Sequence, residues 1–84
     1  MSRAPVLSLA ALPMGRSARI TALALPEREA SWLRAVGLGE GVELTLLRGA
    51  PFGGPLHLRT SGGAELAVDR ALAGHVEVEE GGPA

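Results

Sequence analysis

The sequence contains no cysteine, no lysine and no tyrosine, and its aromatic residues are Trp32 and Phe52 alone. The lack of cysteine excludes disulfide bridges, thiol nucleophiles and thiolate metal sites. With so few aromatic side chains, a folded core must be built from leucine, valine, isoleucine and alanine. The net charge of −1, with arginine as the basic residue throughout, gives no general attraction for polyanions. The composition therefore predicts that nucleic acid is not a partner.

The length and hydrophobicity describe one small globular domain. The chain has 84 residues, of which 46% are hydrophobic. A domain of this size buries only about 60–65% of its unfolded surface, so a deep catalytic cleft is hard to build. The serines stand in no nucleophile motif, and we predict that the protein is not an enzyme. No apolar run approaches the roughly 20 residues of a membrane span, so we expect no membrane insertion and a cytoplasmic location.

The spacing of apolar residues predicts mainly β structure. Five segments alternate apolar and polar side chains, and each is expected to form a short strand: 16–25, 42–47, 56–59, 64–68 and 75–79. Between the first two strands, residues 26–36 have the spacing of one helix face, and a single helical turn is expected at 70–73. Short strands in so small a chain hide their edges best by curling. We therefore expect a five-stranded, partly open barrel with one short helix inserted between strands 1 and 2.

Glycine and proline mark the predicted turns between these segments. Gly37 suits the left-handed position that ends a helix, and Leu38 just beyond it is expected to fold back onto that helix. The other structural turn positions are Gly15, Gly41, Gly53 and Pro55.

The domain is predicted to span residues 7–79. Residues 1–6 precede the patterned segments and are expected to form an N-terminal extension. The glycine- and proline-rich residues 80–84 are expected to form a flexible tail.

His57 and His75 are candidate metal ligands. Both lie in predicted strands, out of phase with the apolar residues, so both side chains should point outward. They could share a face and bind a transition metal together with Glu65 or Glu77. Two solvated strand histidines explain the same pattern, because no motif provides preset ligand spacing.

Trp32 and Phe52 are candidate anchors for a partner protein. Trp32 lies beside the predicted inward face of the helix, and Phe52 lies at the tip of the loop "RGAPFGGP", residues 48–55. Tryptophan is enriched among interface hot spots, but each aromatic could equally cover its own domain. Both interpretations stay open at this point.

Four sequence segments in order resemble the FeoA family, the ferrous iron transport protein A proteins. They are "LAALPMGRSARI" at 9–20, "WLRAVGLGEG" at 32–41, "RGAPFGGP" at 48–55 and "AGHVEV" at 73–78. The resemblance covers nearly the whole chain and implies a small cytoplasmic SH3-like barrel. The sequence departs from the family pattern at Glu40, where a turn proline is usual, at Trp32, where arginine is common, and at Gly54, where aspartate is common.

The resemblance implies a role beside FeoB, the membrane ferrous iron transporter with a cytoplasmic G-protein domain. The protein would be a non-enzymatic accessory or regulatory module of bacterial ferrous iron uptake that docks on the cytoplasmic side of FeoB. The expected contact residues are Trp32, Arg34, Leu38 and Phe52.

The alternative interpretation is a sensor that binds a transition metal directly, as a dimer, through His57 and His75. A docking module needs no cofactor. Weak binding of a divalent metal and formation of a homo-oligomer are compatible with either interpretation.

Overall fold

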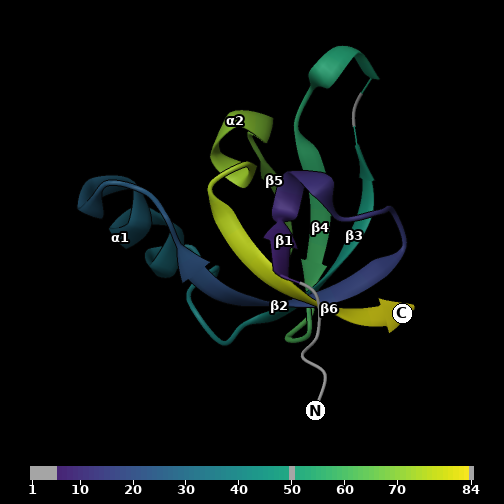
Figure 1. Cartoon of the computed structure of the whole chain (residues 1–84), viewed down its shortest axis with the longest axis horizontal. Coiled ribbons are helices and arrows are strands. Elements are labelled where there is room, and N and C mark those ends of the chain that lie inside the picture. Colours follow the sequence, from purple (N-terminus) through teal and green to yellow (C-terminus); the bar gives the residue numbers. More distant parts are fainter. Residues whose placement is uncertain (1–5, 50, 84) are drawn as a thin grey trace.

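The computed structural model describes residues 6–49 and 51–83. These residues form one antiparallel sheet of six strands, with short helices between strands (Figure 1). In chain order the elements are β1 (Val6–Ser8), η1 (Leu9–Ala11), β2 (Arg16–Leu23), α1 (Glu27–Ala35), β3 (Glu43–Gly49), η2 (Pro51–Gly53), β4 (Leu56–Thr60), β5 (Glu65–Val68), α2 (Arg70–Ala73) and β6 (Val76–Pro83), where η marks a 3-10 turn. The strand order across the sheet is β1-β6-β2-β3-β4-β5.

Strand β2 lies at the centre of the sheet, because it pairs with β3 on one side and β6 on the other. Its side chains alternate as predicted, with Ala18 and Ile20 buried and their neighbours exposed or half-buried. The backbone N–H of Ile20 donates to the carbonyl of Val42 at 2.9 Å, and its carbonyl accepts from the N–H of Gly41 at 2.7 Å. These bonds attach the chain that follows α1 directly to β2.

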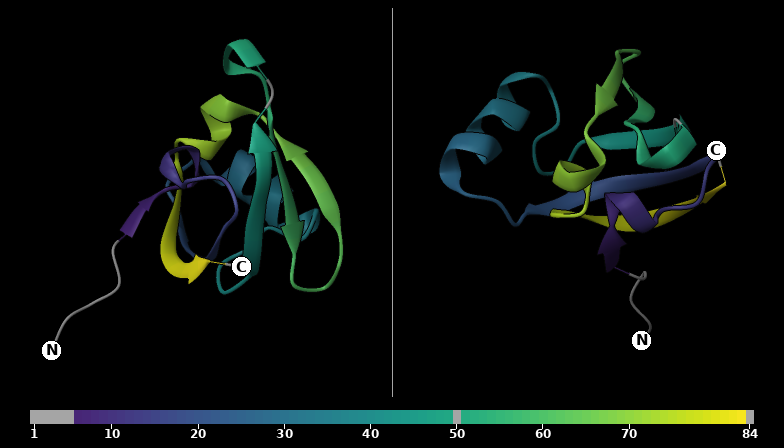
Figure 2. Two further views of the ribbon diagram at one scale, coloured as in Figure 1. Left: turned by 90° about the vertical axis from the view of Figure 1, so that its right-hand side faces the viewer. Right: turned by 90° about the horizontal axis from the view of Figure 1, so that it is seen from above.

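Irregular strand pairing bends the sheet. The register shifts lie between Ser17 and Ala18 and between Ile20 and Ala22 in β2, and between Leu46 and Arg48 in β3. Such bulges leave one residue unpaired and increase the local twist of the strand. The sheet accordingly curls, with β3 and β4 rising steeply from the level of β2 and β6 (Figures 1 and 2).

The curled sheet encloses an aliphatic core, as the shortage of aromatic residues predicted. The largest fully buried side chains are Leu9, Ile20, Leu33, Leu38, Leu44, Leu46, Leu58, Val76 and Val78. Within the described ranges, no polar or charged side chain is buried. Hydrophobic burial of these leucines and valines is therefore the main source of stability.

Helix α1 packs on the core along one face and ends in a Schellman-type cap. Ala30 and Leu33 are buried, as their spacing predicted. Gly37 has a φ of 101°, and its N–H donates to the Arg34 carbonyl at 3.1 Å. The N–H of Leu38 donates to the Leu33 carbonyl at 2.8 Å, which completes the cap and folds the Leu38 side chain into the core.

Two sequence-based expectations were wrong at the ends of the chain. Residues Val6–Ser8 form a sixth strand, β1, on the edge of β6. The predicted tail is largely part of β6, which continues to Pro83 opposite Arg16 on β2. Neither segment has enough alternation to show as a strand, and each is ordered by backbone pairing with a distant part of the chain. Residues 1–5 of the expected extension, and Ala84, lie outside the described residues.

Replacing the cap glycine, Gly37→Ala, should lower the free energy of unfolding by about 1 kcal/mol, because a side chain disfavours the left-handed backbone conformation. A Cβ at this position would meet no atom within 4 Å, so the loss comes from the backbone alone. Urea unfolding of the purified protein measures it. Gly62→Ala is the matched control, because Gly62 is exposed and lacks a positive φ. Equal losses for both variants would contradict the assignment of the cap.

Candidate functional site

The two aromatic side chains proposed as anchors are both exposed, but they lie on separate surfaces. Trp32 is on α1, which projects to one side of the sheet (Figure 1). Phe52 is on η2, at the end of the long β3–β4 hairpin. The views of Figures 1 and 2 agree in placing α1 and η2 apart. A partner that touches both must therefore span a considerable part of the molecule.

The first surface, called here the helix surface, is formed by Arg28, Glu29 and Trp32 of α1 together with Leu72 of α2. These residues border a shallow hollow of about 390 Å³ whose walls are mostly apolar. Trp32 is 55% exposed, so it offers apolar area to solvent while part of the residue is covered by its own domain.

Arg34, an expected contact residue, is engaged within its own chain. Its Nε and Nη2 donate to the two carboxylate oxygens of Glu40 at 3.1 and 2.9 Å, and its Nη1 donates to Glu27 at 3.1 Å. The hydrogen bonds from Arg34, followed by a backbone hydrogen bond, lower the pKa of Glu40 from 4.5 to about 2. The same carboxylates raise the pKa of Arg34. Its guanidinium therefore holds the turn after α1 against the start of the helix.

Leu38 is a buried core residue in the structure and has no side-chain area to offer a partner. The cap that closes α1 turns it inward, as its predicted fold-back onto the helix requires, and this burial is incompatible with its place in the expected contact set.

The two histidines, candidate metal ligands, lie at different places in the fold. His57 is half-buried on β4 opposite Ala67, and His75 is exposed where β6 begins. Among residues 6–49 and 51–83, no three His, Asp or Glu side chains converge to hold a metal ion. The suggested combinations with Glu65 or Glu77 are therefore not assembled within the described part of one chain.

The second surface is the β3–β4 loop, whose described residues between the two strands are 51–55. Its tip is Phe52, whose side chain is fully exposed and whose backbone is left-handed, with φ 59° and ψ 37°. Among the described residues, it alone combines a positive φ with a residue other than glycine. Gly53 follows with a φ of 75°. The Nε of Arg70 on α2 donates to the carbonyl of Gly54 at 3.2 Å and links the loop to the barrel.

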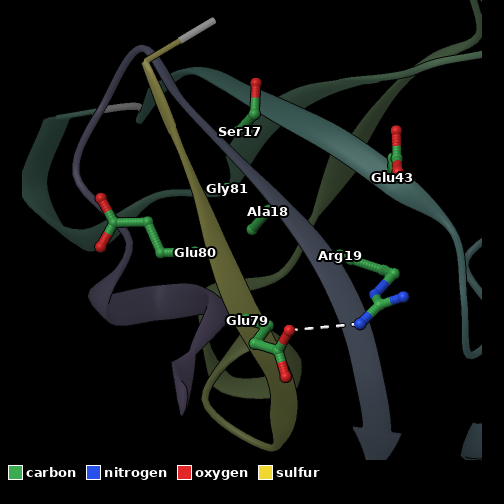
Figure 3. A pocket seen from close by; sticks show the side chains of 7 residues that line it. All are labelled: Ser17, Ala18, Arg19, Glu43, Glu79, Glu80 and Gly81. Carbon is green, nitrogen blue, oxygen red and sulfur yellow. Dashed lines mark hydrogen bonds and ion pairs between the residues drawn. The ribbon is translucent and has the colours of Figure 1, made fainter. Parts of the chain in front are cut away.

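A third feature is a polar hollow of about 270 Å³ over β2, β3 and β6 (Figure 3). Arg19 on β2 points toward Glu79 on β6 and pairs with it at 3.2 Å. Glu80 is paired with Arg16 at 3.0 Å, and the Ser17 hydroxyl is hydrogen-bonded to that of Thr45 at 3.1 Å. These side chains are paired with one another, and Glu43 also lines the hollow. The hollow lies where the register of the β2–β6 ladder shifts between Ser17 and Ala18.

Sequence reasoning missed two residues that shape these surfaces. Glu40 was noted as a departure from a turn proline, yet its ion pair with Arg34 fastens that turn. For Arg70 the local sequence predicts only a helical turn, and nothing in it signals a contact with Gly54, sixteen residues earlier. The glycines of the loop were the only feature of the sequence to indicate that another group approaches its backbone closely.

A curled sheet of short antiparallel strands without a catalytic arrangement in its described part is typical of a small SH3-like binding domain. The chain belongs to the FeoA domain family, which matches residues 7–80. This family consists of non-enzymatic accessory domains associated with ferrous iron transport, which confirms the prediction that the protein is not an enzyme. No curated protein sequence matches the chain closely enough to add a relative.

Solved FeoA structures share the fold. The solution structure of FeoA from Chlorobium tepidum is 30% identical with a TM-score of 0.80, over 88% of this chain and 70% of that one. The crystal structure of an iron uptake regulatory protein (FeoA) is 25% identical with a TM-score of 0.78, over 90% and 97% of the two chains. FeoA from Stenotrophomonas maltophilia, complexed with zinc and described as a prokaryotic SH3 domain protein, is 27% identical with a TM-score of 0.68, over 87% and 89%.

A manganese-dependent transcriptional repressor is similar to this chain in fold only. It is 17% identical with a TM-score of 0.83, and the match covers 90% of this chain and 37% of the repressor. As for membrane insertion, the described helices are all too short and too polar to cross a bilayer.

The Glu40 carboxylate should titrate with a midpoint of about 2 in a 13C NMR pH titration, because the Arg34 guanidinium stabilises its charged form. Since the pKa is depressed in the folded state, the pair stabilises the fold above pH 4.5, and this contribution is lost as the pH falls toward 2. Arg34→Gln should raise the midpoint toward 4.5, and the backbone hydrogen bond should keep it somewhat below that value. High salt should raise the wild-type midpoint by screening the exposed pair. A midpoint that Arg34→Gln leaves in place would contradict this cause.

Proposed function

We propose that the protein is a cytoplasmic accessory component of bacterial ferrous iron uptake that docks on the FeoB transporter through the β3–β4 loop. The observation that supports this most strongly is Phe52, an aromatic side chain that is fully exposed on a strained backbone. Membership of the FeoA family supports the association with ferrous iron transport.

Phe52 does not contribute to the stability of its own domain. An exposed ring buries no apolar area, and the left-handed backbone costs a residue with a side chain about 1–2 kcal/mol. Glycine would fit the same turn without strain, as Gly53 beside it does. A contact outside the chain accounts for an aromatic residue here, because aromatic side chains that fill a partner's pocket are frequent interface hot spots.

The helix surface is the second proposed contact. Its hollow is apolar, and Trp32 has about half of its surface available. Arg28 and Glu29 border the hollow with opposite charges, which suits the polar rim of a protein interface. Because the helix surface and the β3–β4 loop are apart, FeoB would engage them as two patches, and each can be tested alone.

Direct metal sensing is a second candidate function, and the zinc complex of the Stenotrophomonas maltophilia relative favours it. A zinc site in this protein would need ligands from a second copy, since His57 and His75 are not joined by a third ligand within the described part of the chain. Docking has the stronger support, because it alone explains Phe52.

Two substitutions at the loop tip should separate stability from binding. Phe52→Gly should raise the free energy of unfolding by about 1 kcal/mol, because it relieves the left-handed strain. Phe52→Ala should change it by less than about 0.5 kcal/mol, because the strain remains and no packing is lost. Both should weaken binding to intact FeoB in nanodiscs about tenfold or more. Urea unfolding and biolayer interferometry, with and without guanine nucleotide, measure the two effects. Unchanged affinity in both variants would refute docking through this loop.

The helix surface is tested by Trp32→Ala, with the exposed neighbour Ser31→Ala as the matched control. We expect Trp32→Ala to weaken FeoB binding by about tenfold and Ser31→Ala to leave it unchanged, because a half-exposed tryptophan offers most of the apolar area of this surface. The same interferometry assay applies. If Trp32→Ala binds like the wild type while Phe52→Ala does not, the β3–β4 loop docks alone.

A further inference from the structure

The structure assigns to Arg70 the role of a positioning residue that holds the β3–β4 loop in the conformation that presents Phe52. This inference rests on the proposed docking function and names the residue that controls the docking loop. Arg70 lies on a different element, α2, and does not itself form the exposed tip.

Arg70 reaches both ends of the loop. Its Nε donates to the carbonyl of Gly54, the last residue but one before β4, at 3.2 Å. Its Nη2 lies beside Gly49, the last residue of β3, only 2.8 Å from where a Cβ on that glycine would sit. Gly49 and Leu56 are opposite each other at the end of the β3–β4 ladder. The half-buried guanidinium is therefore placed across the base of the loop.

The glycine at position 49 is explained by this contact. Its φ is not in the left-handed region, so the backbone conformation does not require glycine. The space that a side chain would take is instead occupied by the Arg70 guanidinium, with Leu56 Cδ2 at 3.4 Å and Met14 Cε at 3.8 Å as the next neighbours. The guanidinium of Arg70 can therefore occupy this position only if residue 49 has no side chain.

The loop needs such a contact because its own sequence gives little rigidity. Gly53 and Gly54 have wide conformational freedom, and fixing each residue costs about 1–2 kcal/mol in backbone entropy. Hydrogen bonds from a charged donor are stronger than neutral ones, and this one is partly shielded from water. By ordering the loop before the partner arrives, Arg70 reduces the entropy that binding would otherwise lose.

Three variants test this role without changing the exposed tip. Arg70→Met keeps an unbranched apolar side chain and removes the donor. Gly49→Ala places a methyl group where the guanidinium lies and should displace it. Gly62→Ala, in the β4–β5 turn, is the matched control for adding a methyl group to a glycine, because it is exposed and its Cβ would have Thr60 Oγ1 at 3.9 Å as its nearest neighbour.

The first measurement is 15N relaxation of the Phe52 and Gly53 amides in the full chain. We expect order parameters near 0.85 in the wild type and in Gly62→Ala, and values below about 0.6 in Arg70→Met and Gly49→Ala. A double variant that combines Arg70→Met with Gly49→Ala should be little more mobile than Arg70→Met, because the group that the added methyl would displace is already gone. Wild-type order parameters in Arg70→Met would overturn the assignment, as would an additive effect in the double variant.

The second measurement is binding to intact FeoB in nanodiscs. Arg70→Met and Gly49→Ala should each weaken binding about tenfold, with Phe52 still in place. A mobile loop with unchanged affinity, in a protein whose Phe52→Ala variant loses affinity, would overturn the positioning role. Unchanged affinity in Phe52→Ala would refute docking through the loop, and the order parameters alone would then decide whether Arg70 holds it.

Discussion

The pairing of β2 with two neighbours is the constraint on which the rest of the structure depends. β2 joins β3 to β6, and β6 in turn carries β1, so the whole sheet is connected through this strand. Its buried side chains, Ala18 and Ile20, point into a core that contains almost only leucine, valine and alanine. The strand can bend far enough to enclose that core because the β2–β6 ladder has two bulges. The hollow of Figure 3 lies beside one of these, where the register shifts between Ser17 and Ala18.

The charged side chains lie on the surface of the domain, and many of them form ion pairs there. Arg16, Arg19, Arg34 and Arg59 are all in ion pairs with glutamates on the same or a neighbouring element. Exposed pairs of this kind contribute little stability. Trp32 and Phe52 are exposed among these charged side chains and offer apolar area on the surface. Arg70 is different, because in the described structure it binds a backbone carbonyl of the β3–β4 loop instead of a carboxylate.

Most strands of the barrel could be predicted from the sequence, but few of the contacts at the candidate site could be. Alternation predicted β2 to β5 and most of β6, and the spacing of Ala30 and Leu33 predicted the inward face of α1, because each of these patterns is local. The cap at Gly37 and Leu38 was predictable for the same reason, although the burial that it causes removes Leu38 from the contact surface. β1 and the end of β6 were missed, since three residues, or a run of glutamate, glycine and proline, have no pattern of their own. The contacts of Arg34 and Arg70 depend on residues brought together by the fold, and no spacing rule encodes them.

The β3–β4 loop separates what stabilises this protein from what we propose it uses for binding. The core is closed below the loop by the Gly49–Leu56 pair, and Phe52 beyond it touches nothing that the barrel needs. A strained and exposed residue can persist in a domain of this size only if its cost is small beside the hydrophobic burial of the core and if the surrounding chain fixes its conformation. Gly53 satisfies the turn geometry on one side of Phe52, and Arg70 holds both ends of the loop from outside. The loop can therefore present an aromatic side chain to a partner at the small cost of one strained residue. We propose that its affinity also depends on Arg70, a residue that the partner need not touch.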